Sequence, residues 1–307
     1  MKAIKMSKIV LSVVACIGLL GGCGGSSSDT RVEGKAIDDY ISGGKVCIDS
    51  NNNGKCDEGE ASTITDSNGR FYFPSKPKYP LILDCSASES ECKDIATGNA
   101  FNGKLSAPAG SLVLNSLTTI IHEYSKNTGL SPEEVEKDLK EKLDLPEDID
   151  LKTYDPIAES YEPVGQKVLA AQTQTQVLLN GISITTNAPT DIVAYSLAEE
   201  FLKKGEITTD SVKNVIENVI SNTDTDSGGL GGTSVLDVDN VAETLVGFVE
   251  AVGEEATREE AAKVTKALDE SSDEIVAGEE VDPQEVIENT EVNVDDVVPP
   301  ATGGGSI

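Results

Sequence analysis

The side chains best suited to chemistry in this sequence of 307 residues lie in one short segment, residues 49–60. Oxygen donors recur there at alternating positions, which suits Ca²⁺, an ion that takes about six to eight oxygen ligands. Gly54 stands at the sixth position, where such a loop turns sharply. The segment matches the twelve-residue calcium-binding loop. The predicted ligands are Asp49, Asn51, Asn53, the backbone carbonyl of Lys55, Asp57 and Glu60.

Three of these ligands are carboxylates and two are neutral amides, a composition that indicates modest affinity. We expect a dissociation constant of roughly 10⁻⁵ to 10⁻³ M, as in extracellular modules. An ion bound in this range stabilises structure and does not act as a signalling trigger. The alternative interpretation of the same residues is a hairpin turn rich in Asn and Gly that binds nothing.

The six cysteines of the chain fall into three groups. Cys16 lies in an N-terminal leader, and Cys23 follows the end of that leader. The remaining four form an even set, which indicates disulfides in an exported protein. Sequence alone permits several pairings, and the short separations favour Cys47–Cys56 and Cys85–Cys92. A zinc site is the rival interpretation, but neither pair has the two-residue spacing of a zinc knuckle and the single histidine is distant.

Residues 1–22 have the organisation of a secretory signal, with three lysines before a twelve-residue apolar stretch, residues 9–20. That stretch is shorter than the about 20 residues needed to span a bilayer. Two glycines then precede Cys23, an ending that resembles the lipobox of bacterial lipoproteins. The resemblance implies that Cys23 is acylated and attaches the chain to a membrane through its acyl groups.

The residues after Cys23 support this interpretation. Residues 23–31 are rich in glycine and serine and predict a flexible tether. No aspartate follows Cys23, which resembles the sorting of lipoproteins to the outer membrane of Gram-negative bacteria. An ordinary signal that is cleaved nearby, and releases a free secreted protein, is the alternative.

Charge restricts the partners of the protein. Removal of the leader, which has three lysines and no acids, changes the formal net charge from −30 to −33. Such a chain repels nucleic acid and anionic lipid headgroups, so we expect no nucleic-acid partner. The absence of tryptophan also leaves no rich stacking surface. The net negative charge is compatible with a folded region that is kept at a distance from the membrane surface, and it favours the binding of cations.

The periodicity of apolar residues predicts an α+β fold. Residues 32–110 alternate in short runs separated by Gly, Asn and Pro, which predicts a small β-sandwich. Residues 111–270 carry helical stripes and two capping boxes, which predict a helical bundle. Residues 271–307 are acidic and poor in large apolar side chains, so we expect a largely disordered tail. Within the tail, residues 291–298 could form a strand if offered a sheet edge.

The flanks of the calcium loop are β-like, so the loop is expected to bridge two strands. The residues around it are Gly34 to Asp38, Gly44 to Val46, and a turn from Thr65 to Phe71 with Asp66, Asn68 and Gly69. This set resembles the calcium-binding β-sandwich repeats of bacterial surface proteins, the SdrD B-like and carboxypeptidase-regulatory-like modules. The two cysteines near the loop depart from the common repeat.

No motif for catalysis is evident. His122 is the only histidine, and we expect it to be a partly exposed helix residue beside Glu123. Ser-His-Asp or Cys-His chemistry would have to use it, yet no nucleophile motif precedes it. The chain is therefore predicted not to be an enzyme.

These features predict a non-enzymatic cell-envelope lipoprotein, on the outer membrane or cell surface, that acts in surface interaction or adhesion. It is held on the membrane through Cys23 and is expected to meet a protein partner. A second hypothesis is a subunit of an extracellular filament that self-assembles by strand addition through residues 291–298. A periplasmic enzyme or solute receptor is a third, and it lacks motif support.

Overall fold

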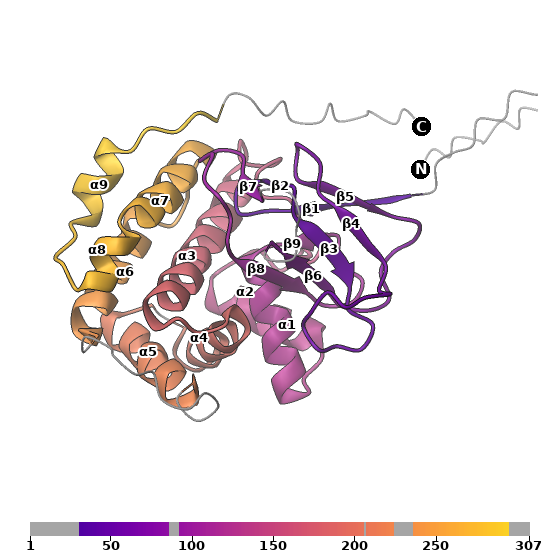
Figure 1. Cartoon of the computed structure of the whole chain (residues 1–307), viewed down its shortest axis with the longest axis horizontal. Helices are drawn as coiled ribbons and strands as arrows, with labels where there is room; N and C mark the ends of the chain where they lie inside the picture. Colours follow the sequence, from indigo (N-terminus) through magenta and orange to yellow (C-terminus); the bar gives the residue numbers. More distant parts are fainter. Residues whose placement is uncertain (1–30, 86–91, 206, 224–235, 295–307) are drawn as a thin grey trace, which may run out of the picture. The chain divides into compact units, whose positions relative to one another are not determined.

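The computed structural model describes residues 31–85, 92–205, 207–223 and 236–294. Cys23, the leader and most of the predicted tether lie outside these residues. Strands precede helices along the chain, so the predicted α+β class is confirmed (Figure 1). The strands are β1 Val32–Ala36, β2 Ile41–Ser42, β3 Lys45–Ile48, β4 Ser62–Ile64, β5 Arg70–Phe73, β6 Leu81–Asp84, β7 Lys93–Asp94, β8 Lys104–Ala107 and β9 Val113–Leu114. The helices are α1 Ser116–Thr128, α2 Pro132–Lys142, α3 Pro163–Thr186, α4 Thr190–Lys204, α5 Thr209–Thr223, α6 Val238–Val252, α7 Arg258–Glu270, α8 Ser272–Ala277 and α9 Pro283–Asn289.

The strands form three small sheets. Their orders are β5-β1-β9, β2-β7 and β4-β3-β6-β8. All pairs are antiparallel except β1 with β9, which run parallel. Apolar side chains from the three-stranded and the four-stranded sheets, among them Phe71 and Leu83, belong to one core cluster. Burying the apolar side chains of both sheets in one core stabilises strands that are too short to persist alone.

Local signals in the sequence explain the helix boundaries. Ser131 and Glu134 form a reciprocal capping box at the start of α2, with Pro132 in the first turn. Thr257 and Glu260 do the same for α7. Each box satisfies backbone N–H groups that the first turn leaves without partners. Both capping boxes were predicted from the sequence, and both are confirmed.

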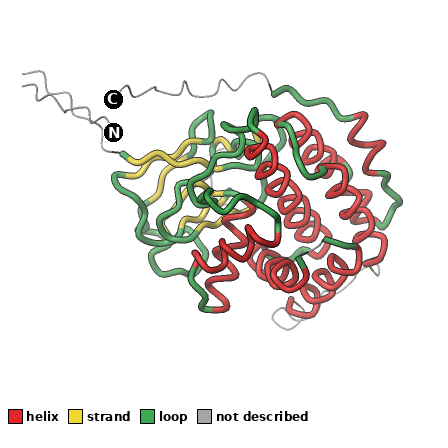
Figure 2. Tube along the Cα trace, turned by 180° about the vertical axis from the view of Figure 1, so that it is seen from behind, coloured by secondary structure: helices red, strands yellow, loops and turns green. Residues whose placement is uncertain are grey.

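The β and helical regions share buried contacts. Figure 2 shows the strands grouped on one side and the helices on the other. One core cluster combines Ile37 and Tyr40, which precede β2, with Leu169 of α3 and Ala261 of α7. Residues on both sides of the boundary expected between 110 and 111 are therefore buried together. Among the helices that the structure describes, none is both long and apolar enough to cross a membrane.

The prediction of disorder across residues 271–307 is wrong for its first part. Residues 272–277 and 283–289 are helical, and Ile275 is buried against the helical core. Val281, Val286 and Ile287 are partly buried against the same core, so a few apolar side chains dock helices that the acidic composition does not predict. Residues 291–294 are not assigned to a strand, and the rest of the segment 291–298 lies outside the described residues. Lys266 instead donates to the carbonyl of Glu291 at 2.7 Å.

Candidate metal centre

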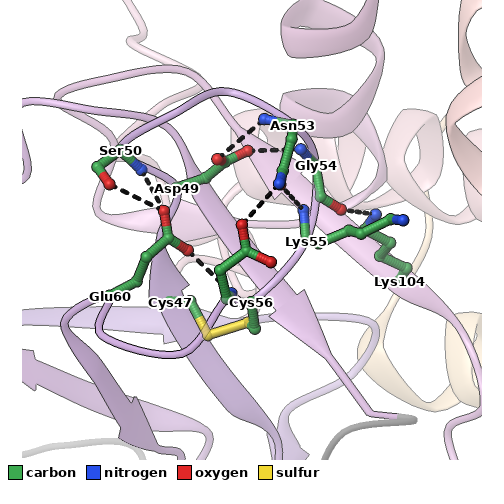
Figure 3. Close-up of a disulfide and its surroundings, with 10 residues drawn as sticks. Cys47, Asp49, Ser50, Asn53, Gly54, Lys55, Cys56, Glu60 and Lys104 are labelled. Atoms are coloured by element: carbon green, nitrogen blue, oxygen red, sulfur yellow. Dashed lines mark hydrogen bonds between the residues drawn. A yellow bond between two sulfur atoms is a disulfide. The ribbon is translucent and has the colours of Figure 1, made fainter.

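The candidate calcium loop, residues 49–60, joins β3 to β4. The two strands pair antiparallel, with Cys47 opposite Ser62, so the loop leaves and re-enters the same sheet as predicted. Cys47 is buried in β3 and is bonded to Cys56 within the loop, with their Cα atoms 5.5 Å apart (Figure 3). Both predicted disulfides are confirmed, since Cys85 and Cys92 are also bonded, with a Cα separation of 5.6 Å.

Asp49 organises the first half of the loop. Its Oδ1 accepts the backbone N–H of Asn53 at 3.1 Å and its Oδ2 accepts that of Gly54 at 2.7 Å. Asn51 and Asn53 repeat the pattern, because their Oδ1 atoms accept the N–H groups of Asn53 at 3.0 Å and Lys55 at 2.9 Å. Hydrogen bonds to backbone N–H groups therefore fix the side chains of Asp49, Asn51 and Asn53 along one tight turn.

Glu60 closes the loop on its first half. Its Oε1 accepts the N–H and the hydroxyl of Ser50, at 2.7 and 2.9 Å, and its Oε2 accepts the N–H of Asp57 at 3.1 Å. Oδ2 of Asp57 in turn accepts Nδ2 of Asn51 at 2.8 Å and of Asn53 at 2.6 Å. These two amide donors lower the pKa of Asp57. The structure thus joins the five predicted side-chain ligands in one hydrogen-bonded network.

Gly54 marks the sharp turn of the loop, with φ of +73°, a conformation that side chains rarely adopt. Its carbonyl accepts a hydrogen bond from Nζ of Lys104, on β8. A Cβ atom at Gly54 would lie 3.5 Å from Nζ of both Lys104 and Lys126, the latter on α1. Two lysines from distant parts of the sequence therefore face the turn, and no local pattern could have identified them.

The donor set fits a hard cation. Three carboxylates, two amides and a backbone carbonyl are the oxygen types that Ca²⁺ takes, and hydrogen bonds join the five side chains in one network. Within the described ranges, however, no group of three or more His, Cys, Asp or Glu side chains is close enough to hold a metal. Asn51 and Asn53 present Nδ2, not oxygen, to Asp57. A bound ion would therefore have to displace these two amide hydrogen bonds.

The prediction that His122 is partly exposed is wrong. It lies on α1, its side chain is only 4% exposed, and its Nε2 has no hydrogen-bond partner among the described residues. Glu123 beside it is also buried and accepts the hydroxyl of Ser106, on β8, at 3.0 Å. β8 therefore covers the face of α1 that was expected to be partly exposed to solvent. Burial, aided by Lys126 and Lys104, lowers the pKa of His122 to about 4.

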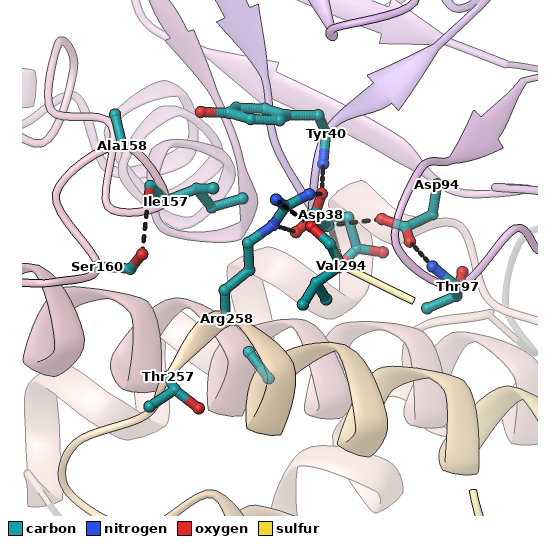
Figure 4. Close-up of polar contacts among 12 residues, drawn as sticks. Asp38, Tyr40, Asp94, Thr97, Ile157, Ala158, Ser160, Thr257, Arg258 and Val294 are labelled. Carbon is teal, nitrogen blue, oxygen red and sulfur yellow. Dashed lines mark hydrogen bonds and ion pairs between the residues drawn. The ribbon is translucent and has the colours of Figure 1, made fainter. Parts of the chain in front are cut away.

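A second buried group was missed by sequence reasoning. Asp39 accepts two hydrogen bonds from Arg258 of α7, from Nε at 2.6 Å and Nη2 at 2.7 Å. Figure 4 shows Arg258 pointing from α7 toward the segment that carries Asp38 and Tyr40. Asp94 accepts the N–H of Asp39 at 2.7 Å and that of Thr97 at 2.8 Å. Burial and the charge of Asp39 raise the pKa of Asp94 to about 6. Asp38, which directly precedes Asp39 in the chain, is also buried.

We predict opposing pH effects from these two groups. His122 has a folded pKa below the unfolded value of about 6.5, so its contribution to stability is present at neutral pH and lost as pH falls towards 4. Asp94 has a folded pKa above its unfolded value, so its contribution is present at low pH and lost as pH rises through about 6.

His122→Gln should isolate the first effect. The difference in unfolding free energy between wild type and variant is expected to shrink by about 3 kcal/mol between pH 6.5 and 4, because the variant has no imidazole to protonate. Urea denaturation at a series of pH values measures this difference. If this difference in unfolding free energy stayed constant with pH, His122 would have the same pKa in the folded and unfolded states, and the prediction would be wrong.

Comparison with known proteins returned no match among family models, curated proteins or solved structures.

Proposed function

We propose that this chain is a non-enzymatic lipoprotein of the cell envelope, whose short strands form a sandwich stabilised by one Ca²⁺ ion. The observation that carries the proposal is the hydrogen-bonded network of residues 49–60, anchored to β3 by the Cys47–Cys56 disulfide. The residues that would hold the ion are Asp49, Asn51, Asn53, Asp57, Glu60 and the carbonyl of Lys55. The ion would supply positive charge between three carboxylates that otherwise repel one another.

The attachment to a membrane is proposed from the leader and from Cys23. In this proposal the acyl groups and the tether hold an acidic body above the envelope surface, at the outer membrane or outside it, where extracellular calcium is available. The helical region would then present a surface for a protein partner. Cys23→Ser is expected to move the chain from the membrane fraction to the soluble fraction, and a variant that stays on the membrane would exclude lipid attachment at this residue.

Calcium should stabilise the protein measurably. At 1 mM free Ca²⁺, dissociation constants of roughly 10⁻⁵ to 10⁻³ M correspond to a gain of about 0.4–2.7 kcal/mol. For a chain of this size the melting temperature should rise by about 1–10 °C above that in chelator. Differential scanning calorimetry with and without chelator measures the shift.

Asp49→Asn combined with Glu60→Gln tests whether the loop is responsible. Each replacement keeps one of the two accepting oxygens, turns the other into an NH2 group, and removes the charge that a cation needs. The double variant should melt at the same temperature with and without calcium. The matched control is Asp138→Asn with Glu141→Gln, which removes two exposed acids from α2 and should keep the full shift. An equal shift in both double variants would place calcium elsewhere.

A further inference from the structure

A cleft of about 340 Å³ lies where the β region meets the helices. Acidic side chains line one part of it, namely Asp38, Asp94 of β7 and Asp269 of α7. Apolar side chains line another part, among them Phe101 and Ile184. Its size is in the range of small-molecule sites, which are concave and largely apolar with a few placed polar groups. No part of the proposed calcium loop contributes to this cleft.

The carboxyl groups of this region differ in their hydrogen-bond and ion-pair partners. Asp39 is paired with Arg258, and Asp94 accepts two backbone N–H groups. Asp269 accepts Nδ2 of Asn99 at 3.2 Å. Asp38 is only 8% exposed, and its carboxyl group accepts no hydrogen bond from any residue that the structure describes. The carboxyl oxygens of Asp38 are not among the fully enclosed unpartnered atoms of the described residues, and Asp38 lines the cleft, so a donor that enters the cleft can reach them.

The cleft also lacks a positive charge. Among the described residues that line it there is no Lys, Arg or His. Burial and the neighbouring charges of Asp94 and Asp269 raise the pKa of Asp38 well above its usual value, as expected where carboxyl groups meet no counter-charge. The hydroxyl of Ser183, which lines the same cleft, is buried and has no partner among the described residues. It offers an additional acceptor.

The kind of cation follows from the geometry. An inorganic ion such as Ca²⁺ needs several oxygens that converge on one point. Asp94 and Asp269 already accept hydrogen bonds from protein groups, so Asp38 is the one carboxyl group of the cleft without such a bond among the described residues. An ammonium group instead needs one strong acceptor and tolerates spread charges around it. Ile184 is 42% exposed although it is large and apolar, and an aliphatic chain attached to that ammonium would cover it.

We propose that this cleft binds an organic ammonium ion that carries a short aliphatic chain, with the ammonium on Asp38 and the chain against Ile184 and Phe101. Free alkylamines and the lysine side chain of a peptide share this chemistry. The site shares no residue with the calcium loop. Failure of this proposal would therefore leave the proposed function unaffected, and the reverse also holds.

The test is a titration of the full chain with pentylamine, in which binding is measured by isothermal titration calorimetry or by changes in amide chemical shifts. Pentanol is the matched neutral ligand. We expect saturable binding of pentylamine and at least about tenfold weaker binding of pentanol, because only the ammonium can donate a charged hydrogen bond to Asp38. Nα-acetyl-lysine methylamide distinguishes the sources: comparable binding indicates a peptide side chain, and its exclusion indicates a free amine.

Asp38→Asn should weaken pentylamine binding by about tenfold or more. The variant is not expected to melt below wild type, since it removes an unpaired buried carboxyl group. Ile184→Ser should weaken binding through the aliphatic chain without touching the acids. The control Asp138→Asn removes an exposed charge from α2 and should bind as wild type does. Absence of saturable binding, equal binding of pentanol, or unchanged binding by Asp38→Asn would each overturn the proposal.

Discussion

Replacing Arg258 by methionine is expected to lower the free energy of unfolding by about 3–5 kcal/mol. Arg258 of α7 bonds both carboxylate oxygens of Asp39, and it donates from Nη1 to the carbonyl of Val294 at 3.0 Å. Its side chain is 14% exposed and that of Asp39 is 5% exposed. Without the guanidinium, Asp39 would be left charged and buried beside Asp38 and Asp94.

Urea denaturation of Arg258→Met measures this loss. Adding Asp39→Asn to the variant should recover part of it, because the double variant no longer buries an unpaired charge. The control on the same helix is Lys263→Met, whose ion pair with Glu259 is exposed and should contribute less than about 1 kcal/mol. Equal losses of unfolding free energy for Arg258→Met and Lys263→Met would mean that the buried pair between Arg258 and Asp39 stabilises the protein no more than an exposed ion pair does.

Removing the Cys47–Cys56 disulfide, by Cys47→Ala with Cys56→Ser, is expected to cost about 2.6 kcal/mol. A cross-link over this short sequence separation of 9 restricts the unfolded chain, and its loss restores that freedom. Calcium affinity should fall as well, because Cys56 lies inside the loop and the bond holds it against β3. Thermal melts at several calcium concentrations measure both effects.

The second disulfide is the matched control. Cys85→Ala with Cys92→Ser removes a bond of similar sequence separation, 7, that lies outside the loop. We expect a stability loss of similar size, about 2.5 kcal/mol, with calcium affinity unchanged. If both double variants lost the same calcium response, the Cys47–Cys56 bond would have no specific role in organising the loop.

The parts of the fold that were predictable depend on short stretches of sequence. Capping boxes such as Ser131 with Glu134 act within one turn, and the loop of residues 49–60 joins two paired strands, as its β-like flanks predicted. The disulfides Cys47–Cys56 and Cys85–Cys92 followed from their small separations. Local rules of this kind need no knowledge of tertiary structure.

The features that were missed depend on contacts between distant residues. Asp39 and Arg258 are 219 residues apart in the sequence, and no local pattern pairs them. His122 was expected to be partly exposed because its helix was considered without β8, which covers it. Lys104 of β8 and Lys126 of α1 lie against the turn at Gly54, and this contact also depends on how β8 and α1 pack around the loop. Only the packing of the β region against the helices brings such groups together.

A calcium titration followed by amide chemical shifts tests the central claim most directly. The N–H groups of Asn53 and Gly54 bond Asp49 and should report an ion held by that carboxylate. We predict saturable shifts at these two amides, with a dissociation constant of roughly 10⁻⁵ to 10⁻³ M, that are lost in Asp49→Asn with Glu60→Gln. Shifts that are absent at millimolar calcium, or that persist unchanged in the double variant, would contradict a calcium ion in this loop.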